Sequence, residues 1–305
     1  MRNAFADELT KIAVEDARVV LLSGDIGNKL FDKFKAKSET RFYNCGVAEA
    51  NMIGVAAGLA LSGLRPFVYT ITPFTTTRCF EQIRVDACYH HVPVVIVGTG
   101  SGLSYAELGP THHSLEDMAI LRSLPNMRVL APCDSTELRL ALRAVLLDDS
   151  PAYIRIGKKG EPAIHAAPPA FKIGEAITVR SGTDVGLLCA GNMMAEAIKA
   201  AEMLAGRGIS AEVASFHTVK PLDGAYLARA GERFRLVVTI EEHSRIGGFG
   251  SAVAEWYAAQ GRLVQQLGFA TDDAFMHEVG SQEYARKKYG LTADNITAGV
   301  LARLS

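Results

Sequence analysis

Glu49 is the side chain in this sequence whose setting most favours chemistry. It lies in residues 44–64, NCGVAEANMIGVAAGLALSGL, and is the only formally charged residue of that run. Burial in apolar surroundings would disfavour the charged form and raise the pKa of Glu49, so that a proton is available near neutral pH. The alternative is an acid at a helix N-terminus that the helix dipole stabilises. Local sequence leaves both interpretations open, because structural carboxylates can also have shifted pKa values.

Two further segments follow expected strands, at the position where ligands bind in parallel α/β sheets. Residues 24–28 read GDIGN, which has neither P-loop nor GxGxxG spacing, so a plain turn is an equal alternative. Residues 101–114 read SGLSYAELGPTHHS and end in His112 and His113, which titrate near neutral pH. No third residue at ligand spacing accompanies them, so we expect no metal site there. Ser114 could cap the next helix, with Asp117 at the capping-box position.

Arg2 and Arg155 are candidates for binding an anion, because a guanidinium matches the geometry of a phosphate or sulfonate. The alternative for each is a solvated surface charge. Four later histidines have no evident partners in the sequence, and we interpret them as structural: His165, His217, His243 and His277.

Alternating elements in the first half of the chain would position these residues. We expect strands at residues 19–23, 41–44, 65–70, 92–98, 127–131 and 152–156. Helices are expected between them, at residues 3–15, 48–61, 78–88, 115–123 and 135–147. This alternation predicts a parallel sheet covered by helices on both faces.

A change in composition separates a second domain. Residues 157–169, GKKGEPAIHAAPP, read as a linker. The alternation then restarts, with strands at residues 184–189, 210–214 and 235–240 and helices at residues 193–206 and 251–260. We therefore predict an α/β fold of two consecutive domains, residues 1–157 and 179–305, joined by a linker at residues 158–178.

The bulk composition is that of an ordinary globular protein. Of 305 residues, 49% are hydrophobic and 21% charged, and the net charge of −1 favours neither nucleic acid nor a membrane surface as partner. The five cysteines form no CxxC pair, which favours buried free thiols. The first residues predict an amphipathic helix with acids rather than a signal peptide, and the apolar runs are too short to span a membrane. We expect a cytoplasmic protein.

Taken in order, the segments resemble the C-terminal half of a transketolase. GDIGN, CGVAEANMIGVAAGLA, RCFEQIRVDA and GPTHHSLEDMAILRSLPNMRVLAPCD are similar to the pyrimidine-binding domain of that family. Residues 217–223, HTVKPLD, and 241–250, EEHSRIGGFG, resemble its C-terminal domain. The resemblance spans nearly the whole chain, and deoxyxylulose-phosphate synthases share much of it.

The resemblance implies thiamine diphosphate as cofactor and gives Glu49 a role. In this family a glutamate pairs with N1′ of the aminopyrimidine and promotes its imino tautomer, which removes the thiazolium C2 proton. Ile26 corresponds to the apolar ledge that bends the cofactor, and His112 to a histidine on the substrate side. The expected cofactor-binding residues are Asp25, Ile26, Glu49, Phe74 and Arg78. The expected catalytic residues are Glu49 and His112, and the expected substrate-binding residues are Arg2, Lys29, His112, His113 and Arg155.

Four positions depart from the family pattern. Thr75 and Thr76 stand where aromatic residues are expected under the aminopyrimidine, which leaves Phe74 as the stacking residue, one position out of register. The Asp before GPTH is Leu108, and a substrate-contacting His is Gly100. A serine of the phosphate site is Lys29. Loss of the Asp and the His with both arginines kept suggests an anionic ketose donor.

The resemblance also implies a missing half. In this family a separate N-terminal domain binds the diphosphate and its Mg²⁺ or Ca²⁺, and the sequence contains no match to that motif, so we expect no metal ligand for it in this chain. We therefore expect the C-terminal subunit of a split transketolase, which moves a two-carbon ketol unit from a ketose to an aldose within an α2β2 assembly with an N-terminal partner subunit.

Two other functions remain open. One is the β subunit of a 2-oxoacid dehydrogenase E1, which shares the two-domain plan but lacks the GPTH loop. The other is a non-catalytic regulatory or scaffold subunit, suggested by the altered aromatic run and Leu108.

Overall fold

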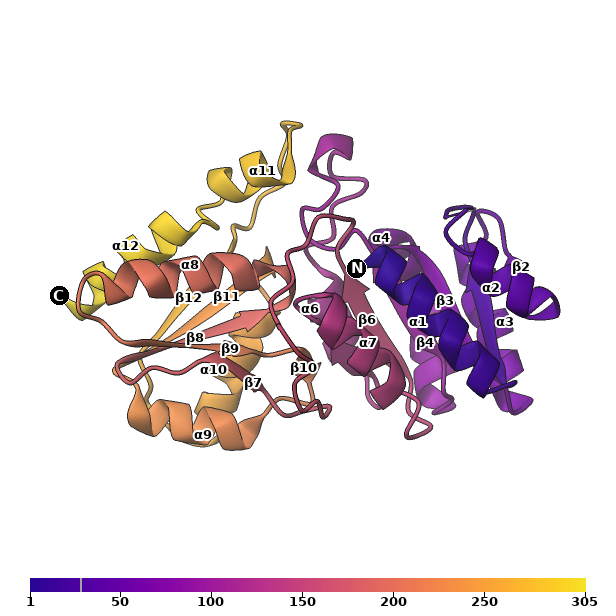
Figure 1. The fold of residues 1–305 in the computed structure, drawn as a ribbon, viewed down its shortest axis with the longest axis horizontal. Helices are drawn as coiled ribbons and strands as arrows, with labels where there is room; N and C mark the ends of the chain where they lie inside the picture. The colour runs from indigo at the N-terminus through magenta and orange to yellow at the C-terminus, as the bar shows by residue number, and fades with distance from the viewer. Residues whose placement is uncertain (28) are drawn as a thin grey trace.

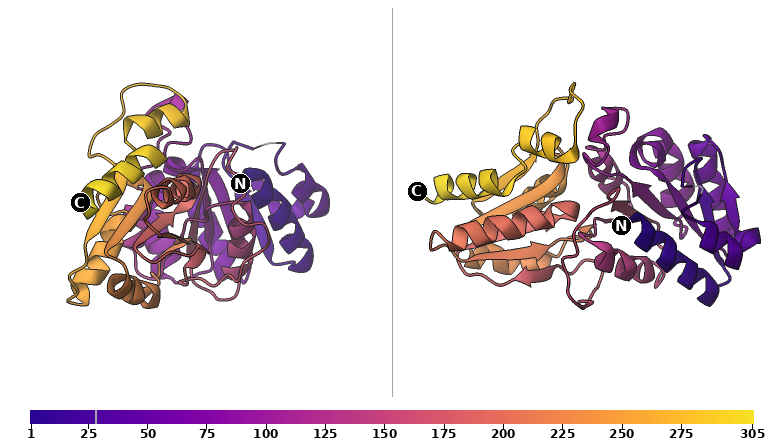
Figure 2. Two further views of the ribbon diagram at one scale, coloured as in Figure 1. Left: turned by 60° about the vertical axis from the view of Figure 1, so that its left-hand side comes forward. Right: turned by 45° about the horizontal axis from the view of Figure 1, so that its top comes forward.

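The computed structural model describes residues 1–27 and 29–305, and Asn28 of the GDIGN turn lies outside the described residues. It contains two α/β lobes that meet near the N-terminus, with the C-terminus at the far end of the second lobe (Figures 1 and 2). The two-domain α/β architecture expected from the sequence is confirmed.

The first sheet has seven strands in the order β10-β5-β6-β4-β3-β1-β2. Its six parallel strands are β1 (Val19–Ser23), β2 (Phe42–Asn44), β3 (Arg65–Ile71), β4 (Val95–Thr99), β5 (Arg128–Leu130) and β6 (Ala152–Ile156). The central strands β1, β4 and β6 are buried along their whole length, as a sheet covered on both faces requires.

Helices cover both faces of this sheet (Figure 1). They are α1 (Arg2–Glu15), α2 (Asp32–Lys37), α3 (Glu49–Leu61), α4 (Thr72–Thr75), α5 (Phe80–Gln82), α6 (Asp117–Arg122) and α7 (Ser135–Ala144). Short 3₁₀ segments are η1 (Glu39–Arg41), η2 (Thr77–Cys79) and η4 (Ala106–Leu108), and η3 (Ile83–Tyr89) is a π-helix. The helix expected at residues 78–88 is therefore a succession of 3₁₀, α and π turns.

The second sheet has five strands in the order β12-β11-β8-β9-β7. These are β7 (Ile177–Arg180), β8 (Val185–Ala190), β9 (Ala211–Ser215), β11 (Leu236–Ser244) and β12 (Gln266–Thr271), and only β7 is antiparallel. The 3₁₀ turn η5 (Gly191–Met193) leads into α8. In Figure 1, α8 (Met194–Ala205) and α12 (Ala293–Leu304) lie on one side of the sheet, and α9 (Gly224–Arg233) and α10 (Phe249–Ala259) on the other. Helix α11 (Gln282–Lys288) approaches the first lobe.

Several contacts join the two lobes. Strand β10 (Thr218–Lys220) comes from the second half of the chain but pairs antiparallel with β5 at the edge of the first sheet. Arg122 of α6 forms an ion pair with Glu255 of α10 at 2.5 Å. The chain start is held at the same junction, because the Met1 amino group binds Glu161 at 2.6 Å.

The structure corrects one local expectation. Helix α6 begins at Asp117 after Glu116, without a side-chain capping bond, so the predicted capping box of Ser114 and Asp117 is wrong. The physical reason is that the Asp117 carboxylate binds Arg155 instead. Within the described part of the chain, no helix combines the length and apolar character needed to cross a membrane.

Candidate active site

Glu49 is the first residue of α3, and its side chain is buried, with 4% exposed. Both carboxylate oxygens accept hydrogen bonds from Nη1 of Arg78, each at 3.0 Å. Arg78 is 50% exposed along its side chain. The expected burial of Glu49 is confirmed, but the acid is not isolated, because a guanidinium that is half open to solvent stands against it.

Two rings extend the site from Arg78. The Arg78 guanidinium carbon lies 4.2 Å from the centre of the Phe74 ring, a cation–π contact. The Phe74 ring lies edge-on to His112, with 5.3 Å between centroids. Nδ1 of His112 is 2.9 Å from the hydroxyl of Thr111. Glu49, Arg78, Phe74 and His112 therefore form one continuous row of contacts from α3 to the GPTHH loop.

The two threonines of the altered aromatic run do not face this row. Thr75 and Thr76 are fully buried, and the Thr76 hydroxyl donates to the Thr72 carbonyl at 2.7 Å. Phe74 is half-buried. Among the side chains of α4, Phe74 is thus the aromatic ring placed next to Arg78, and its stacking role stays a prediction.

Tyr105 continues the row on its other side, and the sequence analysis missed it. Its ring lies 5.9 Å from that of His112, and Nζ of Lys158, which also pairs with Glu107, lies 4.5 Å from its centre. A Cβ atom at Gly100 would clash with the Tyr105 ring. Tyr105 therefore fills the space beside Gly100, and the one signal in the sequence was an aromatic residue in that loop.

The GDIGN turn is connected to the loop that precedes Glu49. The Asp25 amide donates to the Gly46 carbonyl at 3.0 Å, and the Asp25 carboxylate accepts from Asn44 at 3.1 Å. Ile26 is half-buried, whereas Asp25 and Lys29 are exposed. The structure thus places Asp25 and Ile26 next to the entry of α3, and their cofactor contacts stay predictions.

Arg2 offers an unsatisfied donor. Its Nε is buried and has no hydrogen-bond partner among the described residues. Its charge acts on Tyr69 of β3: burial raises the pKa of the Tyr69 hydroxyl to about 12, and Arg2 opposes that shift. A buried N–H without a partner is costly unless a ligand satisfies it.

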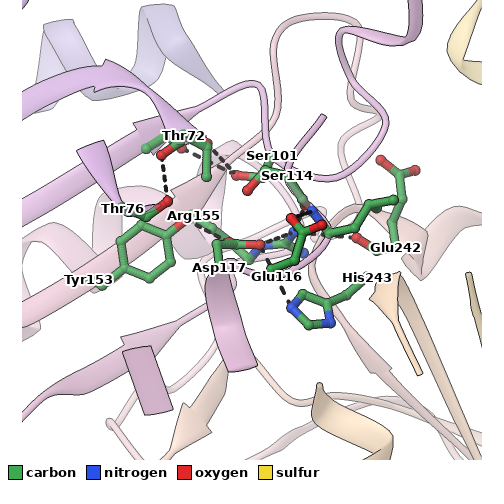
Figure 3. Close-up of polar contacts among 12 residues, drawn as sticks. Thr72, Thr76, Ser101, Ser114, Glu116, Asp117, Tyr153, Arg155, Glu242 and His243 are labelled. Atoms are coloured by element: carbon green, nitrogen blue, oxygen red, sulfur yellow. Dashed lines mark hydrogen bonds and ion pairs between the residues drawn. The ribbon is translucent and has the colours of Figure 1, made fainter. Parts of the chain in front are cut away.

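Arg155, by contrast, is fully engaged. Its Nε and Nη2 bind the two oxygens of Asp117 at 2.8 and 3.1 Å, and the Tyr153 hydroxyl donates to the same carboxylate at 2.6 Å (Figure 3). Nη2 also reaches the carbonyls of Ser114 and Glu242, each at 3.3 Å. Burial acts to raise the pKa of Asp117, but the Arg155 charge outweighs it and leaves that pKa below the ordinary value. The expected anion-binding role of Arg155 stays a prediction, and it would compete with this pairing.

His113 faces different surroundings from His112. It helps to line a cavity of about 360 Å³ that it shares with Ser244 and Thr271 of the second lobe. Burial lowers the pKa of His113, against a hydrogen bond to the backbone of Ala106. The structure therefore brings His112 into the row with Glu49 and directs His113 elsewhere.

Comparison with known protein families matches both lobes. The model described as "Transketolase, pyrimidine binding domain" matches residues 1–161, and "Transketolase, C-terminal domain" matches residues 174–296.

The chain belongs to the transketolase family.

Relatives of nearly equal length support this assignment. The chain is 40% identical to the 6-deoxy-6-sulfo-D-fructose transketolase subunit SqwH of Clostridium sp. (strain MSTE9), over 97% of this chain and 92% of that protein. It is 34% identical to a subunit of the apulose-4-phosphate transketolase of Phocaeicola vulgatus, over 97% and 94%. A solved structure described as "Split gene transketolase, inactive beta4 tetramer" superimposes with a TM-score of 0.89 at 34% identity, over 99% and 96%.

A transketolase pyrimidine-binding domain implies thiamine diphosphate, and the residues of the row suit the aminopyrimidine. Glu49 is a buried carboxylate whose partner, Arg78, is half exposed and can leave at little cost. Phe74 presents a ring face that Arg78 now covers. Both groups are therefore available to a flat, weakly basic ring that replaces the guanidinium.

Proposed function

We propose that this chain is the C-terminal subunit of a split, thiamine-diphosphate-dependent transketolase that is active only with an N-terminal partner subunit. The observation that carries the proposal is the buried Glu49 at the start of α3, in contact through Arg78 with Phe74 and His112. The similar length of relatives named as transketolase subunits supports the split.

Each residue of the row has a task in this proposal. Thiamine diphosphate, when bound, supplies the nucleophilic carbon that carries the two-carbon ketol unit. Glu49 holds a proton at N1′ of its aminopyrimidine, where the buried setting keeps water away. Phe74 and Ile26 provide apolar surfaces against the cofactor. His112, oriented by Thr111, exchanges a proton with a substrate oxygen.

The surface beside Glu49 suits a partner. Val47, two residues before Glu49, is 82% exposed. Along α3 the side chains of Asn51, Val55 and Gly58 share one exposed face, and a Cβ at Gly58 would meet no atom within 4 Å. In the proposed α2β2 assembly the partner covers this face and supplies the diphosphate site with its Mg²⁺ or Ca²⁺. Glu49 then lies at a subunit boundary.

The proposed donor is a ketose with an anionic end. Arg2 has a free buried N–H, Lys29 is exposed at the neighbouring turn, and Tyr105 fills the space beside Gly100. The name of the 40% identical relative specifies 6-deoxy-6-sulfo-D-fructose, which carries a sulfonate. We take that sugar as the first donor to test and apulose 4-phosphate as the second.

The test is reconstitution with the product of the neighbouring gene. Each chain alone and the mixture are assayed for ketol transfer with thiamine diphosphate, Mg²⁺, an aldose acceptor and each anionic donor. We expect activity in the mixture only, with an uncharged ketose as the poorer donor. Activity from this chain alone would overturn the split. A stable complex that decarboxylates 2-oxoacids without ketol transfer would favour the dehydrogenase alternative, and a complex with neither activity the regulatory one.

A further inference from the structure

A cluster of three different ligand types lies at the start of α7, away from the row described above. It consists of Cys133, Glu137 and His165, whose donor atoms all lie within 4.8 Å of one another. Cys133 is 2% exposed, and the side chains of Glu137 and His165 are 0% and 8% exposed. Cys133 and Glu137 belong to the first domain and His165 to the linker. The sequence analysis interpreted His165 as structural because its partners lie about thirty positions earlier.

We propose that Cys133, Glu137 and His165 bind a divalent transition-metal ion, with Zn²⁺ as the preferred ion. Thiolate, imidazole and carboxylate are the three protein ligands of zinc, and a thiolate disfavours Mg²⁺ and Ca²⁺.

The geometry converges on one point. Nε2 of His165 lies 2.9 Å from Oε1 of Glu137 and 3.9 Å from Sγ of Cys133. A single ring nitrogen therefore faces both a carboxylate and a thiol, and one proton can serve only one of them. Ligand atoms of tetrahedral zinc are about 3.4–3.6 Å apart, so entry of the ion requires shifts of about 0.5 Å or less.

Hydrogen bonds hold the ligands in place independently of any ion. The other oxygen of Glu137 accepts the backbone N–H of Cys133 at 2.7 Å. Asp134 accepts the backbone N–H groups of Ile164 and His165 with one oxygen, at 2.8 and 3.2 Å, and caps α7 with the other. Such outer contacts orient metal ligands and raise affinity.

The charge of the cluster also favours a cation. Glu137 and Asp134 lie beside Cys133, and burial together with these two carboxylates raises the pKa of the thiol. Without an ion the thiol stays protonated. Binding of M²⁺ replaces the thiol proton and any proton on His165, which pass to solvent, so that the ion supplies the positive charge that two carboxylates and a thiolate lack.

A second imidazole lies close to the cluster. His217 is 1% exposed, its Nε2 has no hydrogen-bond partner among the described residues, and the charges of Glu137 and His165 act on its pKa. It comes from the C-terminal half of the chain and is the candidate for a fourth ligand. The ion would then fasten the first domain, the linker and the second domain at one point. This matters because residues 157–176 contain no helix or strand in the described structure.

The experiment uses the full chain, stripped with a chelator and titrated with Co²⁺ as a spectroscopic substitute for Zn²⁺. We expect one equivalent to bind, with a thiolate-to-cobalt charge-transfer band, and one equivalent of Zn²⁺ to compete with it and raise the thermal midpoint. Cys133→Ser should remove the band, and His165→Gln, in the partly exposed linker, should weaken binding at least 10-fold. Cys88→Ser is the matched control, because Cys88 is also 2% exposed but lies outside the cluster.

Two outcomes would overturn the proposal. One is a stripped wild-type chain, folded by circular dichroism, that takes up no Co²⁺ or Zn²⁺. The other is a charge-transfer band that persists in Cys133→Ser or disappears in Cys88→Ser. Both readouts are independent of ketol transfer.

Discussion

Two carboxylate–guanidinium pairs in the first domain differ in how open they are. Asp117 and Arg155 are sealed, with 0% and 3% of their side chains exposed, and Arg155 uses two nitrogens on the carboxylate and two backbone carbonyls besides. Glu49 is as deeply buried, but Arg78 is half exposed and contacts it through one nitrogen. A sealed pair serves the fold, whereas a buried acid with a removable partner is available to a ligand.

The energetics of the two pairs should differ accordingly. Removing one member of a sealed pair leaves an uncompensated buried charge, which costs about 3–5 kcal/mol. Solvent can replace an exposed member, and exposed pairs contribute about 0–1 kcal/mol.

The largest effect on stability is expected for Asp117→Asn. The substitution leaves the Arg155 charge without its counterion and should lower the free energy of unfolding by about 3–5 kcal/mol, measured by urea denaturation. The double variant Asp117→Leu with Arg155→Met should recover much of this loss, because it removes both charges. A loss below about 1 kcal/mol for Asp117→Asn would contradict the sealed character of the pair.

Acid should narrow the difference between wild type and Asp117→Asn. The folded-state pKa of Asp117 lies below its ordinary value of 3.8, so its contribution to stability is present above that value. The contribution is lost as the pH falls through the lowered pKa. Urea midpoints of both proteins from pH 6 downwards measure this, and a difference that stays constant to pH 2 would show that Asp117 does not titrate with folding.

A smaller effect, on binding rather than on stability, is expected for Arg2→Gln. Arg2 has a buried N–H without a partner in the described structure, and a hydrogen bond to a charged group contributes about 1.5–3 kcal/mol. In the reconstituted enzyme, KM for an anionic donor should rise about 10-fold or more with kcat little changed. Arg18→Gln, at an exposed arginine paired with Asp16, is the control. Equal KM values for both variants would remove Arg2 from the donor site.

The smallest effect on stability is expected for Arg78→Met. Because solvent can replace the half-exposed guanidinium, the free energy of unfolding should fall by about 1 kcal/mol or less. Urea denaturation next to Asp117→Asn gives the ratio directly. A loss equal to that of Asp117→Asn would show that the two pairs are equivalent and would end the distinction drawn between them.

The sequence predicted elements that hydrophobic patterns define locally. Strands β1 and β6 have the predicted bounds, and α3 begins within one residue of the expected position. Strand β10 was not predicted, because three residues become a strand only by pairing with β5 of the other lobe. Asp117 was assigned to a helix cap because its partner, Arg155, lies 38 residues away.

The candidate site shows the same division. Glu49 and His112 could be selected from their local setting and from the resemblance, and they lie in one row of contacts. The pairing of Glu49 with Arg78 joins residues 29 positions apart, and the Tyr105 ring occupies the space beside Gly100 through the path of a loop. Residue types indicate which side chains can do chemistry, but their partners depend on tertiary structure.

The most direct test of the central claim is the rate of ketol transfer by the reconstituted enzyme with Glu49→Gln. Glutamine keeps the size of the side chain but cannot share a proton with N1′, so kcat should fall on the order of 10²-fold or more. Circular dichroism and co-purification with the partner should be unchanged. Glu81→Gln, an exposed acid paired with Arg84, is the control and should keep full activity. A Glu49→Gln enzyme that assembles and retains the wild-type rate would contradict the assignment of this site.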